Sequence, residues 1–174
     1  MLVHRSLMEA EALRLHEELK TTPNILGYTV REILAWADVF VAEVEGEFAG
    51  VCASKDLLFG WTDIAALYVL SDFRGSGLGT ELYTAAWERA RQRQRHIFTL
   101  SRSPAVIHLM ERFGMEIHHS MLAAPLAVHL HMNRHMMSVY RIREARRKSI
   151  ANKGLARLVS GVKRHNPPSD PDAI

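Results

Sequence analysis

Hydrophobic residues recur along the chain with two different spacings, which together predict a mixture of helices and strands. From about residue 78 to 94 they return every three or four positions, as on one face of a helix. This predicted buried stripe consists of Leu78, Leu82, Ala85, Ala86 and Ala90. Short apolar runs with the length and composition of strands lie at 39–44, 47–52, 64–70 and 97–100. The step Glu45-Gly46 predicts that the first two runs form an antiparallel hairpin.

Two capping boxes mark the starts of helices in the first part of the chain. Ser6 with Glu9 predicts a helix over about residues 7–20. Thr29 with Glu32 predicts a second, short helix. Both pairs have the spacing at which a hydroxyl and a carboxylate satisfy each other's backbone N–H groups.

A further helix is predicted after the run at 97–100. Ser103 is a good N-cap residue, and Pro104 suits the first position of a helix. This helix is predicted to end near Gly114. Residues 115–140 are predicted to form a last pair of strands.

The size and composition of the chain fit one compact domain. Its 174 residues, of which 48% are hydrophobic, provide enough apolar surface for one core but are few for two domains. The sequence contains no run of about 18 apolar residues and no apolar leader after Met1. We therefore expect a soluble, cytoplasmic protein. The single cysteine, Cys52, lies in an apolar run and is expected to be a buried structural thiol.

Basic residues gather near the C-terminus, although the net charge of the whole chain is only +3. Apolar residues spaced among them from Val139 to Val162 predict amphipathic helices. We therefore divide the chain into a domain over residues 1–140, a basic helical extension over 141–165 and a disordered end over 166–174.

The basic extension has two candidate roles. The favoured one is packing against the domain or against a second copy in a homodimer. The other is binding to nucleic acid or to an anionic membrane, because a basic amphipathic helix also fits a negative surface. From Ser138 to Arg164, Tyr140 is the one Phe, Tyr or Trp residue, which argues against the stacking used in single-strand binding.

The strongest chemical signal is the turn Arg74-Gly75-Ser76-Gly77-Leu78-Gly79, between a predicted strand and a predicted helix. Free N–H groups at a helix start bind phosphate groups, and glycines let a diphosphate approach the backbone closely. Thr80 stands where the dinucleotide fingerprint has its last glycine, and no Gly-Lys-Ser/Thr completes a P-loop. The turn thus predicts a diphosphate site of neither of these two common kinds.

At this turn the sequence resembles the GNAT superfamily of acetyl-CoA-dependent N-acetyltransferases. The family signature Arg/Gln-x-x-Gly-x-Gly/Ala is matched by Arg74, Gly77 and Gly79. Residues 67–73 are similar to the family's fourth strand and its exit, and residues 103–115 are similar to its second conserved motif. The resemblance implies an α/β (α+β) fold with a splayed, mostly antiparallel mixed sheet flanked by helices.

The resemblance also implies a binding mode for acetyl-CoA as the acyl donor. The pantetheine arm would run between the fourth and fifth strands, with the Val69 N–H at the thioester carbonyl. An amine acceptor of unidentified structure would attack the thioester directly, in a ternary complex. The residues implied in cofactor binding are Leu67, Tyr68, Val69, Arg74, Gly75, Ser76, Gly77, Leu78, Gly79, Thr80 and Ser103.

The attacking amine must be neutral, so a general base is needed. Family members often carry a carboxylate six residues before the valine of the fourth strand, and Asp63 has that position here. Asp63 is therefore the first candidate for the base, with a role as a turn or cap residue as the alternative. Glu32, Asp38 or a histidine are the substitutes.

The chain departs from the family at the usual general acid, because Met110 replaces the tyrosine that protonates the departing thiolate. A thiol has an ordinary pKa of about 8.5, so a thiolate leaves with less assistance than an alkoxide does. Tyr68, Ser103, Tyr83 or water are the candidate proton donors.

Histidines are numerous, at ten, and His129, His131 and His135 lie close together in the sequence. On a strand, His129 and His131 would share one face. We nevertheless expect no metal site, since no carboxylate or cysteine stands near them and the family requires no metal. Lining the acceptor pocket is the expected role of these histidines.

The sequence leaves three classes of function open. The first is an N-acetyltransferase acting on a primary amine. The second is a non-catalytic acyl-CoA-binding regulatory module that kept the fold and lost its general acid. The last is an adaptor for nucleic acid or membrane that depends on the basic extension.

Overall fold

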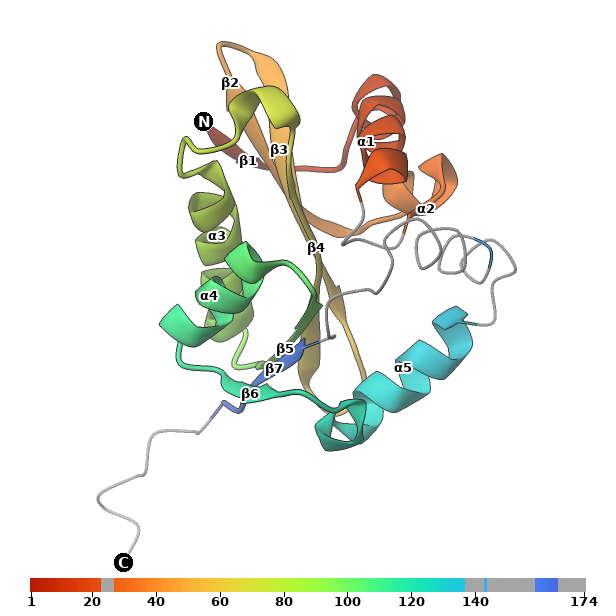
Figure 1. The fold of residues 1–174 in the computed structure, drawn as a ribbon, viewed down its shortest axis with the longest axis vertical. Helices are drawn as coiled ribbons and strands as arrows, with labels where there is room; N and C mark the ends of the chain where they lie inside the picture. The colour runs from red at the N-terminus through yellow and green to blue at the C-terminus, as the bar shows by residue number, and fades with distance from the viewer. Residues whose placement is uncertain (23–26, 137–142, 144–158, 166–174) are drawn as a thin grey trace, which may run out of the picture.

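The computed structural model describes residues 1–22, 27–136, 143 and 159–165, and it contains a seven-stranded sheet with helices on both faces (Figure 1). The strand order is β1-β2-β3-β4-β5-β7-β6. The strands are β1 (Leu2–His4), β2 (Asp38–Val44), β3 (Glu47–Asp56), β4 (Trp61–Val69), β5 (His96–Ser101), β6 (Glu116–His118) and β7 (Val159–Lys163). Neighbouring strands are antiparallel except for β4 and β5, which are parallel. The mixed, mostly antiparallel sheet is therefore confirmed.

The helices divide between the two faces of this sheet. They are α1 (Glu9–Thr21), α2 (Val30–Leu34), α3 (Leu78–Gln92), α4 (Pro104–Arg112) and α5 (Leu126–Met136). Helices α3 and α4 cover one face, whereas α1, α2 and α5 cover the other (Figure 1). The short turns η1 (Ser71–Phe73) and η2 (Met121–Ala123) complete the regular elements. No helix of the described residues is long and apolar enough to cross a membrane.

The local signals in the first half of the chain are largely confirmed. Strands β2 and β3 form the predicted hairpin, with Glu45 and Gly46 both at positive φ in the turn. The capping box of Thr29 and Glu32 starts α2 as predicted. Cys52 is buried.

The predicted capping box at the first helix is wrong. Helix α1 has Met8 at its N-cap, and the Glu11 carboxylate accepts the Met8 N–H at 2.7 Å. Arg5 donates two hydrogen bonds to the same carboxylate, at 2.6 and 2.8 Å. Because Glu11 is held by this ion pair and is buried, the helix begins at Glu9 rather than near Leu7.

Strands β4 and β5 pair over only part of their length. Residues Trp61–Ile64 pair with His96–Thr99, whereas β7 pairs with the other edge of β5 from Ile97 to Ser101. The register of β4 against β3 shifts at Ala65, which is an extra residue in β4. Beyond this bulge, β4 has β3 as its one strand partner among the described residues. The sheet is therefore splayed, as the family resemblance implies.

Helix α5 replaces the second strand that we predicted for residues 115–140, so that prediction is wrong. The signal that sequence reasoning passed over is Pro125, whose carbonyl accepts the Val128 N–H in the first turn of α5. Ala124, Ala127 and Val128 have helical spacing and are buried against the sheet. The histidines expected on a strand therefore belong to a helix.

Strand β7 corrects our prediction for the C-terminal extension. Val159 and Val162, which we assigned to an amphipathic helix, lie in β7 between β5 and β6. Residues 159–162 are all buried, as expected of a strand that is covered on both faces. The boundary at residue 140, residues 141–142 and 144–158 of the extension, and the predicted disordered end lie outside the described residues.

Candidate active site

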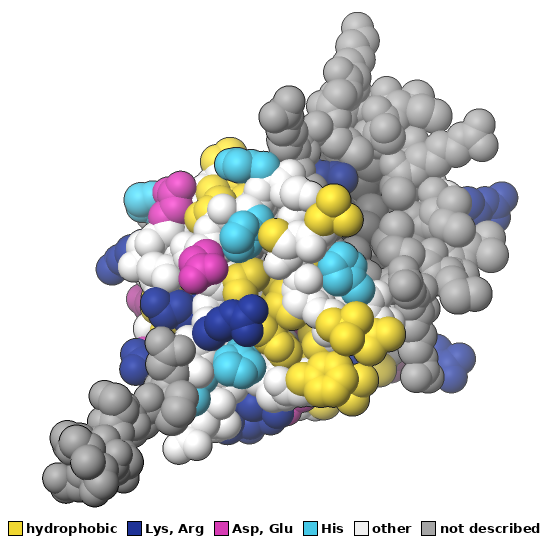
Figure 2. Space-filling view, turned by 90° about the horizontal axis from the view of Figure 1, so that it is seen from below, with side chains coloured by type: hydrophobic (Ala, Val, Ile, Leu, Met, Phe, Trp, Pro, Cys, Tyr) yellow, Lys and Arg dark blue, Asp and Glu magenta, His cyan; other side chains and the backbone are white. Residues whose placement is uncertain are grey.

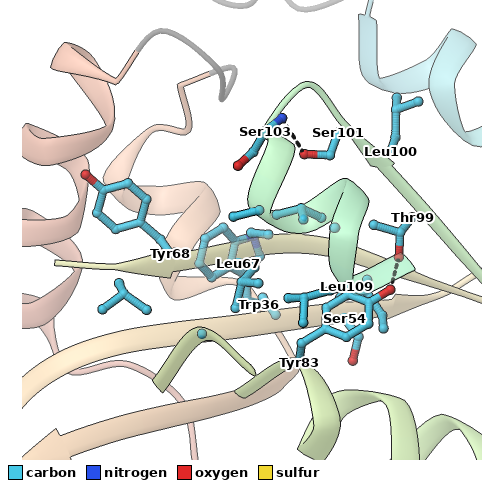
Figure 3. A pocket seen from close by; sticks show the side chains of 18 of the residues that line it. Trp36, Ser54, Leu67, Tyr68, Tyr83, Thr99, Leu100, Ser101, Ser103 and Leu109 are labelled. Carbon is cyan, nitrogen blue, oxygen red and sulfur yellow. Dashed lines mark hydrogen bonds between the residues drawn. The ribbon is translucent and has the colours of Figure 1, made fainter. Parts of the chain in front are cut away.

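The splayed strands open into a cleft of about 1960 Å³ (Figure 3). It is bordered by the end of α1, strand β4, the glycine turn, the end of β5 and the start of α4. The predicted site residues that line it are Asp63, Leu67, Tyr68, Val69, Arg74, Gly75, Gly77, Leu78, Gly79, Thr80 and Ser103. Ser76 is the exception, and its hydroxyl donates to the Phe73 carbonyl at 2.6 Å within the turn.

Two of the three glycines in the turn are required by its backbone. Gly75 and Gly77 have φ values of 81° and 86°, which residues with side chains rarely adopt. Gly77 is the N-cap of the 15-residue helix α3. Within the described part of the chain, the N–H groups of Leu78 and Gly79 donate to no backbone carbonyl. The positive end of α3 is therefore open toward the cleft.

Gly79 has a different role, since it does not have a positive φ. A Cβ atom built on Gly79 would lie 3.7 Å from the Val69 Cγ2 atom, an ordinary contact distance. The fold therefore does not need glycine at this position. A side chain at position 79 would occupy the space between the start of α3 and β4. The resemblance to the family places the cofactor in this space.

The Arg74 side chain turns back onto β4 instead of toward the helix start. Its Nε atom donates to the Val69 carbonyl at 3.1 Å, and its Nη2 atom donates to the Tyr68 hydroxyl at 2.8 Å. The guanidinium also lies 5.3 Å from the centre of the Tyr68 ring. Arg74 thus fixes the glycine turn against the strand that borders the cleft.

The Tyr68 hydroxyl forms hydrogen bonds at the end of helix α1. It donates to the Glu18 carboxylate at 2.8 Å and lies 3.0 Å from the Thr22 hydroxyl. In Figure 3 it points away from the pair formed by Tyr83 and Thr99. Burial, together with the Glu18 carboxylate, raises the pKa of Tyr68 above its ordinary value. These contacts favour a structural role for Tyr68 over proton donation.

Replacing Tyr68 with Phe separates these two roles. Because the hydroxyl connects Glu18 with Arg74, we expect Tyr68→Phe to lower the free energy of unfolding by about 1–2 kcal/mol. Turnover of acetyl-CoA with an accepted amine should fall less than about tenfold, since a general acid is worth 10²–10⁴-fold. Urea unfolding and steady-state kinetics measure the two effects. A loss of about a hundredfold at unchanged stability would make Tyr68 the proton donor.

On the other face of the sheet, Tyr83 and Thr99 form a buried pair inside the cleft (Figure 3). Their hydroxyl oxygens are 3.1 Å apart, and the Tyr83 hydroxyl donates to the Met115 Sδ atom at 3.3 Å. Burial raises the pKa of Tyr83 well above its ordinary value, so the phenol keeps its proton at neutral pH. Met110 is fully buried and does not line the cleft. Tyr83 is therefore better placed than Tyr68 to donate a proton on the face of the sheet that α3 covers.

Asp63 lies on β4 just before the bulge, where its Oδ1 atom is buried without a hydrogen-bond partner. Burial raises the pKa of Asp63 to about 7, and the charge of Lys55 opposes this shift. Asp63 pairs in register with Phe98, so its side chain is on the face covered by α1, α2 and α5. A carboxylate with this pKa can accept a proton near neutral pH.

The alternative carboxylates are engaged in other contacts. Glu32 closes the capping box of α2 with Thr29. Burial opposes the ionisation of Asp38, but hydrogen bonds from His4 and Arg89 outweigh it and hold the pKa of Asp38 below its ordinary value. Asp63 is therefore the carboxylate of this cleft whose contacts suit a general base.

Ser103 is the N-cap residue of α4, as predicted, but its hydroxyl makes no capping hydrogen bond. Its N–H donates to the Ser101 hydroxyl at 3.1 Å (Figure 3). The Ser103 hydroxyl, which faces the cleft, is thus left for a bound molecule.

This geometry makes Ser103→Ala unusually mild. Replacing an N-cap serine usually costs about 1 kcal/mol, but here we expect a loss below about 0.5 kcal/mol because no cap is broken. Acetyl-CoA should bind about three- to tenfold more weakly, the loss of one hydrogen bond. Thermal unfolding and calorimetric titration measure the two effects. The control is Ser101→Ala, which removes a real hydrogen-bond acceptor and should destabilise the fold more.

The histidines do not form a metal site within the described residues. No group of three or more histidine, cysteine or acidic side chains that could hold a metal ion is found there. In Figure 2 the histidines of the visible face are separated by other side chains. His129 and His131 lie on α5, and positions two apart point to nearly opposite sides of a helix. His131 lines the cleft, and its expected role on the acceptor side stays a prediction.

Sequence reasoning missed several residues that line the cleft. Glu18 and Thr22 come from the end of α1, and Trp36 follows α2. Nothing in the local sequence marks these positions. Arg102, between β5 and α4, also lines the cleft and directly precedes the predicted site residue Ser103.

Comparison with known proteins agrees with this geometry. The model of the acetyltransferase (GNAT) family matches residues 7–115. No curated protein matches the chain at a significant level.

Many solved structures share the fold at low sequence identity. Rv2747 from Mycobacterium tuberculosis, in complex with CoA and NLQ, is 15% identical with a TM-score of 0.67, over 93% of this chain and 98% of its own. N-acetylglutamate synthase from Neisseria gonorrhoeae, complexed with coenzyme A and N-acetyl-glutamate, is 18% identical with a TM-score of 0.63. That match covers 96% of this chain but only 36% of the synthase.

A third similar structure is a ribosomal-protein-alanine N-acetyltransferase from Brucella melitensis. It is 22% identical with a TM-score of 0.55, over 67% of this chain and 85% of its own. The family match spans most of the chain and includes the glycine turn, β4 and α4. The chain therefore belongs to the GNAT family of acetyltransferases, whose acyl donor is acetyl-CoA.

Proposed function

We propose that this protein transfers the acetyl group of acetyl-CoA to a primary amine by direct attack in a ternary complex. The observation that carries the proposal is Asp63. Its carboxyl, with a buried and unpartnered Oδ1 atom and a pKa of about 7, opens onto the same cleft as the free N–H groups at the start of α3.

The cofactor fits the residues that the cleft provides. The N–H groups of Leu78 and Gly79 suit the pyrophosphate, because they combine free donors with the positive end of a helix. The absence of a side chain at Gly79 leaves space beside Val69. The edge of β4 beyond Ala65, which has no strand partner within the described ranges, offers backbone groups to the pantetheine arm and a donor for the thioester oxygen.

The two faces of the sheet separate the two ends of the reaction. On the α1 face, Asp63 accepts the proton of the amine, whose nitrogen attacks the thioester carbon. The bond between that carbon and the sulfur then breaks. On the α3 face, the leaving thiolate takes a proton from Tyr83 or from water. The product is an N-acetyl amine and free CoA, so no covalent enzyme intermediate is required.

Thiol release tests this function. Purified protein, acetyl-CoA and a panel of primary amines should produce CoA with at least one amine, in parallel with acetylated product detected by mass spectrometry. The similar structures name both amino-acid and protein-alanine ligands or substrates, so the panel includes free amino acids and peptides with free N-termini. Failure to bind acetyl-CoA would contradict the proposal. Binding without turnover on any amine would support the regulatory module instead.

The remaining expectations about partners stay predictions. These are the homodimer, the contact of the basic extension with nucleic acid or an anionic membrane, and the cytoplasmic location.

A further inference from the structure

Arg102 is an unusual arginine in this cleft. It lies between β5 and Ser103, lines the cleft, and its Nε atom is buried without a hydrogen-bond partner. Within the described residues it forms no ion pair. Asp63 Oδ1 and Arg102 Nε are the two buried side-chain atoms of the described residues that lack a partner, and both residues border the same cleft.

The other arginines of the cleft have partners. Arg74 contacts Tyr68 and the Val69 carbonyl. Arg89 and Arg93 both bind the Asp38 carboxylate, at 2.7 and 3.1 Å. Leaving a buried charged donor unpaired costs free energy, which a ligand can recover. The contrast therefore marks Arg102 as the arginine whose partner is a bound molecule.

The strand geometry puts Arg102 on the acceptor side. Phe98 belongs to the hydrophobic cluster that contains Ala127 and Val128 of α5, and Leu100 packs against this cluster. Side chains at even positions of β5 therefore face α5. Arg102 is the next even position beyond the end of β5. Asp63 shares this face because it pairs with Phe98. Four residues of strand, about 13 Å, separate Phe98 from Arg102, and the long arginine side chain shortens this gap.

We propose that Arg102 binds a carboxylate of the acceptor, so that the acceptor carries an acid group as well as the amine that is acetylated. This inference rests on the proposed function. A guanidinium presents two parallel N–H donors that match the two oxygens of a carboxylate. Asp63 receives the amine end and Arg102 the acid end. A free amino acid and an acidic peptide both have this chemistry.

Matched acceptors test the proposal. Each amino acid of the panel is compared with its carboxamide, for example glycine with glycinamide and glutamine with glutaminamide. The wild-type protein should prefer the carboxylate member by about 30-fold or more in kcat/KM, as expected for a charge-assisted pair. Arg102→Gln should remove this preference by lowering kcat/KM for the carboxylate member far more than kcat/KM for the carboxamide. Arg102→Lys should retain part of it.

Peptides identify the source of the carboxylate. Preference for free amino acids over peptides with acidic side chains would indicate a small-molecule acceptor, and the reverse order an acidic peptide. Either result supports the proposal if Arg102→Gln abolishes the preference. Arg112→Gln serves as the control, because Arg112 is an exposed arginine on α4 outside the cleft lining.

Two results would overturn the proposal. One is an equal loss of activity toward both members of each pair in Arg102→Gln. The other is weaker binding of acetyl-CoA itself to that variant, measured by calorimetry, which would assign Arg102 to a cofactor phosphate.

A failure of the proposed function would be visible separately, as a wild-type protein that acetylates no amine. In that case, the CoA complex is titrated with N-acetylglycine and N-acetylglycinamide. Binding of the acid alone, lost in Arg102→Gln, would still support a carboxylate site at Arg102. Equal binding of both compounds would contradict it.

Discussion

Gly79→Glu is expected to weaken acetyl-CoA binding by about a hundredfold or more while leaving the fold intact or slightly more stable. The new carboxylate would occupy the space beside Val69, next to the N–H groups of Leu78 and Gly79. Like charges brought together at a binding site cost several kcal/mol, and a hundredfold change in Kd corresponds to about 2.7 kcal/mol. Calorimetric titration with acetyl-CoA and with CoA measures the loss.

The stability of Gly79→Glu should change in the opposite direction. Position 79 is in the first turn of α3, where a negative side chain interacts favourably with the helix dipole by about 0.3–1 kcal/mol. Replacing a helical glycine adds a further gain of about 0.5–1 kcal/mol. A variant that loses both binding and stability would indicate a misfolded turn.

Two controls separate the charge from the added volume. Gly79→Gln carries an uncharged side chain of the same length, and Gly79→Ala adds only the Cβ atom, which makes an ordinary contact. The alanine variant should bind acetyl-CoA within about threefold of the wild type, since the family signature accepts alanine here. If glutamine and glutamate weaken binding equally, the site excludes volume and does not hold a diphosphate.

Asp63→Asn is expected to lower kcat about 10²–10³-fold without changing the affinity for acetyl-CoA, because general bases typically contribute 10²–10⁴-fold. In the wild type, kcat/KM for the acceptor should rise with pH up to the pKa of the carboxyl, at about 7. The asparagine side chain has no proton to release in this range, so the variant should lose that inflection. An unchanged pH profile would assign the base to another group.

The same substitution should affect stability with a sign fixed by the raised pKa. The folded state holds the Asp63 proton up to about pH 7, whereas the unfolded chain releases it near 3.8. The folded protein therefore binds more protons between these values, and its stability falls as the pH rises through the window. Asn has no carboxyl group to ionise, so the Asp63→Asn variant does not show this fall in stability with rising pH.

The gain in the free energy of unfolding should thus be small near pH 4 and largest above pH 7. A shift from 3.8 to about 7, at 1.36 kcal/mol per pH unit, sets an upper limit of about 4 kcal/mol. Urea unfolding at pH 5 and pH 8 measures it. A variant less stable than the wild type at pH 8 would show that Asp63 is satisfied by a contact with water or protein.

Features of the molecule that depend on neighbouring residues could be predicted from the sequence. The turn before α3 has positive φ at Gly75 and Gly77, and α4 begins with Pro104. Both the turn and the helix start could therefore be predicted from a few neighbouring residues. The hairpin of β2 and β3 was visible for the same reason. The cofactor half of the candidate site is built largely from such local signals.

Features that depend on distant parts of the chain were not predictable in the same way. Val159 and Val162 of β7 are three positions apart, a spacing that also occurs on one face of an amphipathic helix. Only the pairing of β7 with β5 and β6 identifies this segment as a strand. Tyr83 and Trp87 are buried in α3, although the predicted stripe held only leucine and alanine, because both rings pack against Phe113 at the end of α4.

The acceptor half of the site follows the same rule. The raised pKa of Asp63 arises from the burial of its carboxyl in the folded cleft, which no sequence pattern records. The contact between Glu18 and Tyr68 joins positions far apart in the chain. Arg102 could be noticed beside Ser103, but its unpaired state is a property of the folded cleft.

The position of β7 has a consequence for the synthesis of this protein. Strand β6 ends at His118 and its partner β7 begins at Val159, so residues 119–158 must be translated between them. At about 5–20 residues per second, this interval lasts roughly 2–8 s. Until then β6 has no strand to pair with and the outer edge of β5 is unpaired. The nascent chain therefore carries open strand edges, the kind of surface that chaperones protect from aggregation, until β7 emerges from the ribosome.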